Sequence, residues 1–149
     1  PEQSVPIGHL TGEPGAEGNS DAIIIDNNVL KVIDLKYGKG VRVNAEDNGQ
    51  ARIYALGALQ KFGLVYDQID TVETHIIMPR LADGHTSASY NICELEEFRD
   101  EVELAAAAVA IAGTDDLNPG EKQCKFCRAK AICPALKAEV QGQLAVIST

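Results

Sequence analysis

The sequence predicts an α/β (α+β) fold in which helices flank a mixed central β-sheet, and three observations carry this prediction. Two runs rich in β-branched residues, 22–25 and 30–33, flank a turn-forming stretch. Apolar residues recur at helical spacing over 45–62, and a third strand pattern follows at 71–79. The length of 149 residues corresponds to one ordinary domain, 1–149, with a sizeable core.

The formal net charge of −9 argues against nucleic acid, but the charges are unevenly spread. Residues 31–63 hold six Lys or Arg and three acids. This local excess of bases suits a phosphate substrate, although small charge clusters are also typical of solvated faces. No apolar run is long enough to span a membrane and no signal peptide is evident, so we expect a soluble, cytoplasmic protein.

The first two strands predict a pair of facing carboxylates. With a two-residue turn at Asn27-Asn28, Asp21 lies opposite Asp34. Opposed Cβ atoms lie roughly 5 Å apart, where like charges are destabilising. A divalent cation with oxygen ligands, Mg²⁺ or Mn²⁺, would compensate.

Two neighbours of Asp34 extend this site. Side chains alternate along a strand, so Lys36 lies on the face of Asp34, while Leu35 turns away and leaves its carbonyl near the pair. The simpler alternative is that Asp21 and Lys36 end strands and that Asp34 forms an ordinary surface ion pair.

Residues 2–8 predict a first strand that Pro6 either confines to an edge or ends, and the polar, Gly-rich stretch 9–20 predicts an exposed loop with a solvent-facing His9. After Lys36, the glycines of 38–40 would let Lys39 approach a phosphate, or would simply form a turn.

The helix predicted over 45–62 takes Asn44 as its N-cap and ends at Gly63. Gln50 and Tyr54 are four residues apart and share one face of it. A tyrosine on a helix is more often a core residue than a catalytic one.

Three more elements are predicted downstream. The strand 71–79 carries four residues on one side, with His75 as a paired residue on the other. A hairpin across 82–84 leads to a short strand at 87–92, and a helix follows over 95–111. The residues on the inward side of the first strand are Val72, Thr74, Ile76 and Met78.

A cysteine-rich segment, 119–137, lies near the C-terminus of the sequence. Cys124, Cys127 and Cys133 have the spacing C-x2-C-x5-C, with basic residues between them. In a cytosolic chain such thiols favour metal ligation over disulfides, and zinc with an outside ligand is one option. Cys93 lies at a helix junction, which predicts a cap or a buried thiol.

The ordered set G-x-x-D, strand, I-D-L-K and then Gln50 and Tyr54 resembles the PD-(D/E)XK nuclease superfamily. Within it, the RecB-like branch of phage exonucleases and CRISPR adaptation nucleases is the most similar, and IDLKYGKG and QARIYALGAL resemble an uncharacterised phage and prophage family. The resemblance implies a restriction-endonuclease-like core with Asp21 and Asp34 as metal ligands and Lys36 activating water. It implies that Gln50 and Tyr54 support the site and contact the nucleic acid backbone.

The same resemblance bears on the cysteines. Iron-sulfur members of the branch place three cysteines at this spacing and a fourth upstream, and the three take a [4Fe-4S] cluster only with that fourth ligand. The chain starts at Pro1 without a methionine, so we expect the upstream cysteine and a first core helix to be missing.

The resulting hypothesis is a metal-dependent DNA nuclease, an exonuclease of phage or prophage DNA processing that acts beside recombination or replication proteins. An alternative is a catalytically inactive nuclease-fold module that binds DNA or a protein, with the cysteines as structural metal ligands. A zinc-binding regulatory domain is a third.

Overall fold

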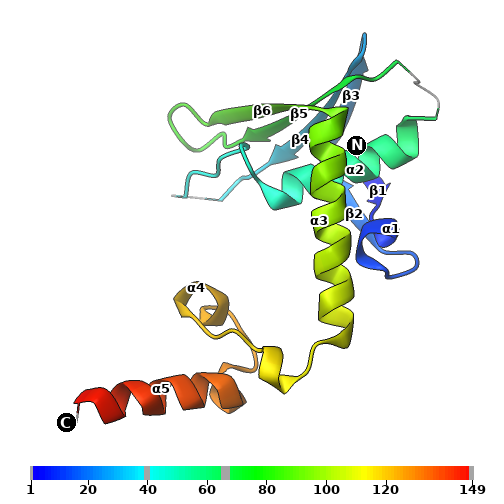
Figure 1. The fold of residues 1–149 in the computed structure, drawn as a ribbon. Helices are drawn as coiled ribbons and strands as arrows, with labels where there is room; N and C mark the ends of the chain where they lie inside the picture. Colours follow the sequence, from blue (N-terminus) through cyan, green and yellow to red (C-terminus); the bar gives the residue numbers. More distant parts are fainter. Residues whose placement is uncertain (1, 39–40, 65–67, 148–149) are drawn as a thin grey trace. The chain divides into compact units, whose positions relative to one another are not determined.

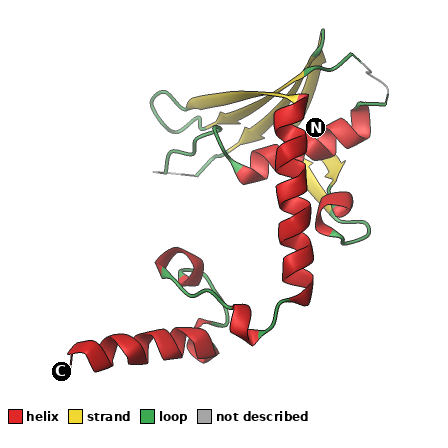
Figure 2. Cartoon of the chain, viewed as in Figure 1, coloured by secondary structure: helices red, strands yellow, loops and turns green. Residues whose placement is uncertain are grey.

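A computed structural model describes residues 2–38, 41–64 and 68–147, and the chain divides into two compact units, Pro1–Ala107 and Ala108–Thr149. The first unit holds a four-stranded sheet in the order β3-β4-β5-β6 and a two-stranded sheet, β1-β2 (Figures 1 and 2). Helices pack against the larger sheet, so the predicted mixed α/β fold is confirmed. The four strands are β3 (Ala22–Asp26), β4 (Val29–Leu35), β5 (Thr71–Ile77) and β6 (His85–Asn91).

The hairpin of β3 and β4 has the predicted register. Its antiparallel pairs run from Asp26 opposite Val29 to Ala22 opposite Ile33. Asn27 takes φ +54°, which suits the first central position of a tight hairpin turn. If this register continues by one pair, the Cα positions of Asp21 and Asp34 lie opposite each other, as the sequence predicts.

Strand β4 runs parallel to β5, and helix α2 (Gly49–Phe62) forms the crossover between them. The start predicted for this helix is wrong. Asn48 is the N-cap, and its side chain accepts a hydrogen bond from the Ala51 N–H at 3.0 Å. Asn44 instead accepts the Glu46 N–H at 3.3 Å within the preceding turn, where Asp47 has φ +53°. The helix ends at Gly63, as predicted.

The first strand is confirmed as β1 (Gln3–Pro6), but the loop predicted over 9–20 is wrong. This stretch holds a short helix, α1 (Gly8–Thr11), and strand β2 (Glu17–Ser20), which pairs antiparallel with β1. The sequence EGNS carries no apolar alternation, so only pairing with β1 makes it a strand. His9 is exposed, as expected.

The core of the first unit forms where α2 packs against both sheets. Small residues on α2 allow this approach: an added Cβ at Gly57 would meet the Pro6 carbonyl and the Val5 side chain. The buried residues include Val5, Leu10, Leu30, Val32, Ala55, Ala58, Val72 and Leu95. Val72, Thr74, Ile76 and Met78 are all buried, which confirms the predicted inward side of β5.

Helix α3 (Ile92–Ile111) begins three residues before its predicted start. Asn91 and Glu94 explain the difference, because each side chain accepts a hydrogen bond from the other's backbone N–H, at 2.8 and 3.0 Å. The hairpin before it is confirmed, with β5 and β6 joined across 78–84.

The second unit consists of short helices whose described side chains are mostly exposed. None of the described helices has both the length and the apolar content that crossing a bilayer requires. Beyond the end of α3, the elements are η1 (Thr114–Asp116), α4 (Glu121–Cys124), η2 (Lys130–Ile132) and α5 (Pro134–Ile147).

Candidate metal-dependent catalytic site

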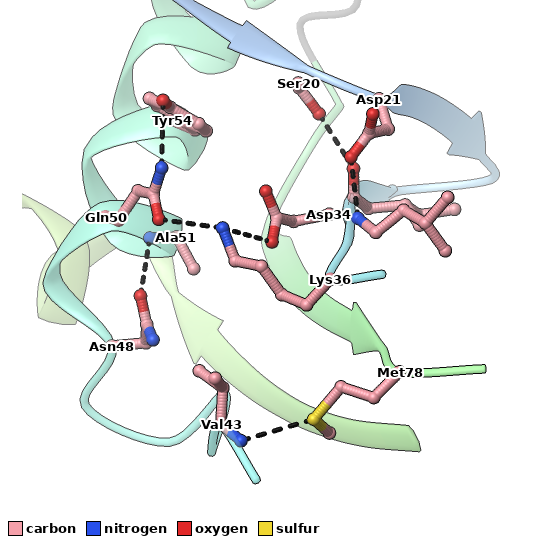
Figure 3. Close-up of polar contacts among 12 residues, drawn as sticks. Ser20, Asp21, Asp34, Lys36, Val43, Asn48, Gln50, Ala51, Tyr54 and Met78 are labelled. Carbon is pink, nitrogen blue, oxygen red and sulfur yellow. Dashed lines mark hydrogen bonds and ion pairs between the residues drawn. The ribbon is translucent and has the colours of Figure 1, made fainter. Parts of the chain in front are cut away.

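A chain of polar contacts joins the end of β4 to the first turns of α2 (Figure 3). The Lys36 ammonium lies 2.9 Å from Asp34 Oδ2 and donates a hydrogen bond to Gln50 Oε1 at 3.1 Å. The Gln50 amide then donates to the Tyr54 hydroxyl at 3.1 Å. Four of the predicted site residues therefore form one connected network, although they come from two separate elements.

Two periodicities bring these side chains together. Asp34 lies in β4 and Lys36 follows the strand directly, two residues on, so both side chains extend toward α2. Gln50 and Tyr54 are four apart on α2 and point back toward β4. The parallel crossover then places that face of the helix beside the end of the strand.

Gly18, the glycine of the G-x-x-D pattern, has a structural reason to be glycine. A Cβ at this position would lie inside contact distance of the Tyr54 ring. The bare backbone of β2 therefore accommodates the ring, which holds the far end of the polar network. The G-x-x-D pattern is visible in the sequence, but the contact with Tyr54 is not, because Gly18 lies in a strand where the sequence predicts a loop.

Asp21 lies at the same end of the hairpin but uses its carboxylate differently. Its Oδ2 accepts a hydrogen bond from the Leu35 N–H at 2.6 Å. The preceding Ser20 hydroxyl donates to the carbonyls of Ala22 and Ile33 at 3.0 and 3.1 Å. These contacts fix the backbone of both strands where the facing acids are found, and they place Asp21 beside Leu35, the residue whose carbonyl was predicted to be a ligand.

Asp34 is more enclosed than its partner Lys36, with 15% of its side chain exposed against 34%. Its Oδ2 is buried and makes no hydrogen bond of good geometry in the described part of the chain, although the ammonium lies at ion-pair distance. The ammonium therefore compensates the charge of this oxygen without donating a well-directed hydrogen bond to it. A buried carboxylate oxygen without directed donors is suited to a cation.

Among the described residues, no group of three or more His, Cys, Asp or Glu side chains could hold a metal ion. A magnesium site needs fewer, since Mg²⁺ keeps several waters and binds through one or two carboxylates and substrate phosphates. Asp21 and Asp34 supply two carboxylates at the same end of the hairpin, which is the number that such a site needs.

The segment between β4 and α2 is tied to β6 by residues that the sequence analysis missed. Thr86 accepts the Ala45 N–H and donates to the Val43 carbonyl, both at 3.1 Å. The Tyr90 hydroxyl accepts the Asp47 N–H at 3.2 Å. These contacts fix the approach to Asn48 and so the start of α2. Thr86 and Tyr90 lie on a half-exposed strand with other hydroxyl side chains, and no sequence pattern marks these two as the residues that bind the segment before α2. Lys39, the predicted phosphate contact, lies outside the described residues.

The second predicted site, the cysteine-rich segment, is less assembled. Gly120 N–H donates to Cys124 Sγ at 3.4 Å and Leu136 N–H to Cys133 Sγ at 3.5 Å, while Cys127 is exposed. The three thiols do not form a metal-binding group in the described chain. Zinc or cluster ligation by them stays a prediction. Cys93 is exposed in the first turn of α3, so its prediction as a cap or a buried thiol is wrong.

On the opposite face of the sheet, His75 is paired, as predicted. It contacts Glu73 Oε2 through Nε2 at 3.0 Å and stacks on His85, whose Nε2 lies 3.0 Å from its Nδ1. The contact with His75, and then Lys31 at 3.5 Å, lowers the pKa of Glu73. This cluster lies apart from Asp34, which faces α2.

Residues 1–147 match a family described as "Protein of unknown function (DUF2800)". No solved structure matches the chain.

Proposed function

We propose that this chain, which belongs to the DUF2800 family of proteins of unknown function, is a metal-dependent nuclease that hydrolyses phosphodiester bonds in DNA. The family description assigns no activity, so the proposal rests on the residues. We propose further that it is an exonuclease of phage or prophage DNA processing, in the cytoplasm of a bacterial host, acting with recombination or replication proteins. This finer part rests on the resemblance to the PD-(D/E)XK superfamily alone.

One observation carries the proposal, namely the contact of Lys36 with both Asp34 and Gln50 at the end of a hairpin that also carries Asp21. A purely structural ion pair needs only one carboxylate and one ammonium. Here a second acid occupies the facing position, where it raises the electrostatic cost of the apo state. In metal-dependent phosphodiester hydrolysis both acids would bind the metal and the lysine would orient the attacking water, so all three residues would have a function.

Each residue has a distinct role in the proposed reaction. Asp21, Asp34 and the Leu35 carbonyl would hold Mg²⁺ or Mn²⁺, which supplies charge for the phosphate and an activated water. The Lys36 ammonium would orient that water and offset charge on the phosphate. Gln50 receives a hydrogen bond from this ammonium and gives one to Tyr54, so the two residues hold Lys36 in place.

The cysteines supply a separate proposal. We infer that Cys124, Cys127 and Cys133 bind Zn²⁺, or a [4Fe-4S] cluster when a fourth ligand is present. Two of the three sulfurs already accept backbone N–H groups. Such hydrogen bonds stabilise a thiolate, which is the form that binds metal.

One observation favours the alternative, a nuclease-fold module that binds DNA or a protein without cutting it. Asp21 Oδ2 already satisfies the Leu35 N–H, which is a structural role that needs no metal. In such a module Asp21 would stabilise the hairpin through the Leu35 N–H, and the Asp34–Lys36 ion pair would help to hold α2 against β4. Metal binding and cleavage separate the two functions.

The test measures cleavage and metal binding together. Labelled single- and double-stranded DNA is incubated with the protein in Mg²⁺, Mn²⁺ or EDTA, and Mn²⁺ affinity is measured calorimetrically. We expect cleavage in either metal and none in EDTA, and a ladder of products for an exonuclease. A chain extended at its N-terminus is assayed in parallel.

Two variants make the result specific. Lys36→Met removes the cation that competes for Asp34, so it should abolish cleavage while Mn²⁺ binds at least as tightly. Asp34→Asn should lose both cleavage and Mn²⁺ binding. Absence of cleavage in every metal, in both the chain and its extended form, would overturn the nuclease proposal and leave the binding module.

A further inference from the structure

We propose that Tyr37, together with Arg80, forms a base-stacking site for an unpaired nucleotide of the substrate, which makes single-stranded DNA, or a frayed DNA end, the preferred ligand. This inference rests on the proposed nuclease function and deepens it. It begins from an aromatic ring that the proposed chemistry leaves unused, directly beside Lys36.

The Tyr37 ring is exposed although the backbone just before it is paired with β5. Its exposed fraction is 65%, while the Lys36 N–H before it donates to the Ile77 carbonyl at 2.8 Å and so continues the β4–β5 ladder. Strand alternation places Tyr37 on the face of Leu35 and Ile77, whose side chains are 47% and 37% exposed. An aromatic ring and two apolar side chains thus lie at the end of the strands that carry the site.

Cations accompany this ring. The Arg80 guanidinium lies 5.0 Å from the ring centroid, and Arg80 has no ion pair among the described residues. Arg42, in the segment between β4 and α2, donates to the Asp83 carbonyl at 2.9 Å, so a second guanidinium contacts the turn that follows Arg80. A π-face with an adjacent guanidinium is the combination that binds successive bases and phosphates of single strands.

The position relative to the proposed metal ligands sets which nucleotide is bound. Tyr37 follows Asp34 by three residues, which is roughly 10 Å along an extended strand. Because Tyr37 lies on the face of the sheet opposite Asp34, a bound strand would pass around the end of β4, and the stacked base would lie one or more nucleotides from the cleaved bond. Bases in a duplex already stack on both neighbours, and only an unpaired base has a π-face to offer.

The first experiment reads stacking without cleavage. The sequence contains no tryptophan, so Tyr37→Trp introduces a single fluorophore. Single-stranded DNA added in EDTA or in Ca²⁺ should quench it strongly, whereas a blunt duplex should not. The matched control is Phe126→Trp, because Phe126 is 86% exposed and has the Lys125 ammonium 5.3 Å from its ring centroid. Equal quenching at both positions would overturn the assignment.

The second experiment locates the base. Oligonucleotides with one abasic residue at successive positions are bound by the protein and by Tyr37→Ala. We expect Tyr37→Ala to weaken single-strand binding about tenfold, and Tyr37→Phe to leave it unchanged. One abasic position should weaken binding to the wild-type protein and have no further effect in Tyr37→Ala, the signature of a coupled pair.

The outcomes separate the two proposals. If the protein cleaves DNA but Tyr37→Ala binds and cleaves single strands and duplexes as well as wild type does, the stacking site is wrong and the nuclease stands. If the Tyr37 effects appear and no metal gives cleavage, the stacking site belongs to a binding module. If neither cleavage nor DNA binding occurs, both proposals fail.

Discussion

The hairpin site of the first unit and the cysteine-rich segment of the second contain comparably clear sequence motifs, but they differ in how the fold holds them. Asp34 lies in β4, whose Leu30 and Val32 are buried, and Lys36 directly follows that strand; both make contacts within 3.1 Å. Cys127 is exposed, and among the described residues the thiols form no metal-binding group.

The difference lies in what supplies the geometry. In the hairpin, sheet register and a packed helix fix the side chains before any ligand binds, at the cost of placing two acids together. In the cysteine segment, large apolar side chains such as Ile132 and Phe126 are 85% and 86% exposed, so little apolar burial orders the chain. A bound metal would therefore order the second segment and only complete the first.

The largest expected effect separates the two regions by catalysis. Asp34→Asn should lower kcat at saturating DNA about 100- to 1000-fold, because it removes charge at the proposed metal site. The triple replacement of Cys124, Cys127 and Cys133 by Ser should keep kcat within about tenfold, since no thiol takes part in the chemistry. Steady-state cleavage in Mn²⁺ measures kcat for both variants. A triple cysteine variant as inactive as Asp34→Asn would contradict the claim that only the hairpin site takes part in catalysis.

Core truncation should separate the regions by stability. Leu30→Ala deletes a fully buried side chain and should lower the free energy of unfolding of the first unit by about 3 kcal/mol. Ile132→Ala, at an exposed position of the second unit, should change the free energy of unfolding of that unit by less than about 0.5 kcal/mol. Urea unfolding followed by circular dichroism compares them. If both variants lost the same free energy of unfolding, Ile132 would have to be buried in solution.

A pair of glycines offers a finer contrast. Gly18→Ala drives a methyl group into the Tyr54 ring and should cost about 1–3 kcal/mol, while loosening the Gln50 network and lowering cleavage. Gly142→Ala meets no atom within 4 Å on helix α5 and should stabilise that helix by about 0.5–1 kcal/mol. Thermal unfolding reports both changes. A neutral Gly18→Ala would show that the ring moves aside without cost.

Metal addition should act on the second unit first. Without metal, the three cysteines of the segment should react readily with a thiol reagent, and Zn²⁺ should protect them and lower proteolysis within residues 108–149. Cleavage of the first unit by the same protease should stay unchanged, because its order does not depend on the thiols. Zn²⁺ that leaves thiol reactivity unaltered would count against ligation.

The smallest expected effect concerns pH and the face of the sheet opposite α2. His75 and then Lys31 lower the pKa of Glu73, so its ionised form is favoured in the folded state. The resulting stability is present above the ordinary carboxyl value of about 4.5 and is lost as the pH falls through the lower, folded-state value. Glu73→Gln should therefore be slightly less stable than wild type at pH 7 and equal to it at pH 2.5. A stability difference between Glu73→Gln and wild type that stays constant from pH 7 to pH 2.5 would mean that the substitution acts through side-chain packing and not through the charge of Glu73.

Local patterns in the sequence determined most of the first unit. The two β-branched runs and Asn27-Asn28 determined the hairpin register, and with it the opposition of Asp21 and Asp34. The spacing of Gln50 and Tyr54 placed them on one helix face. These predictions hold because strand alternation and helical period are properties of a few adjacent residues.

Tertiary structure decided the rest. Strand β2 exists because β1 supplies its hydrogen bonds, and α2 starts at Gly49 because Thr86 and Tyr90 hold the segment before it. The joining of Lys36 to Gln50 depends on the parallel crossover, and the exposure of Tyr37 depends on which face of the sheet α2 covers. Such contacts link residues far apart in the sequence, so no local pattern records them.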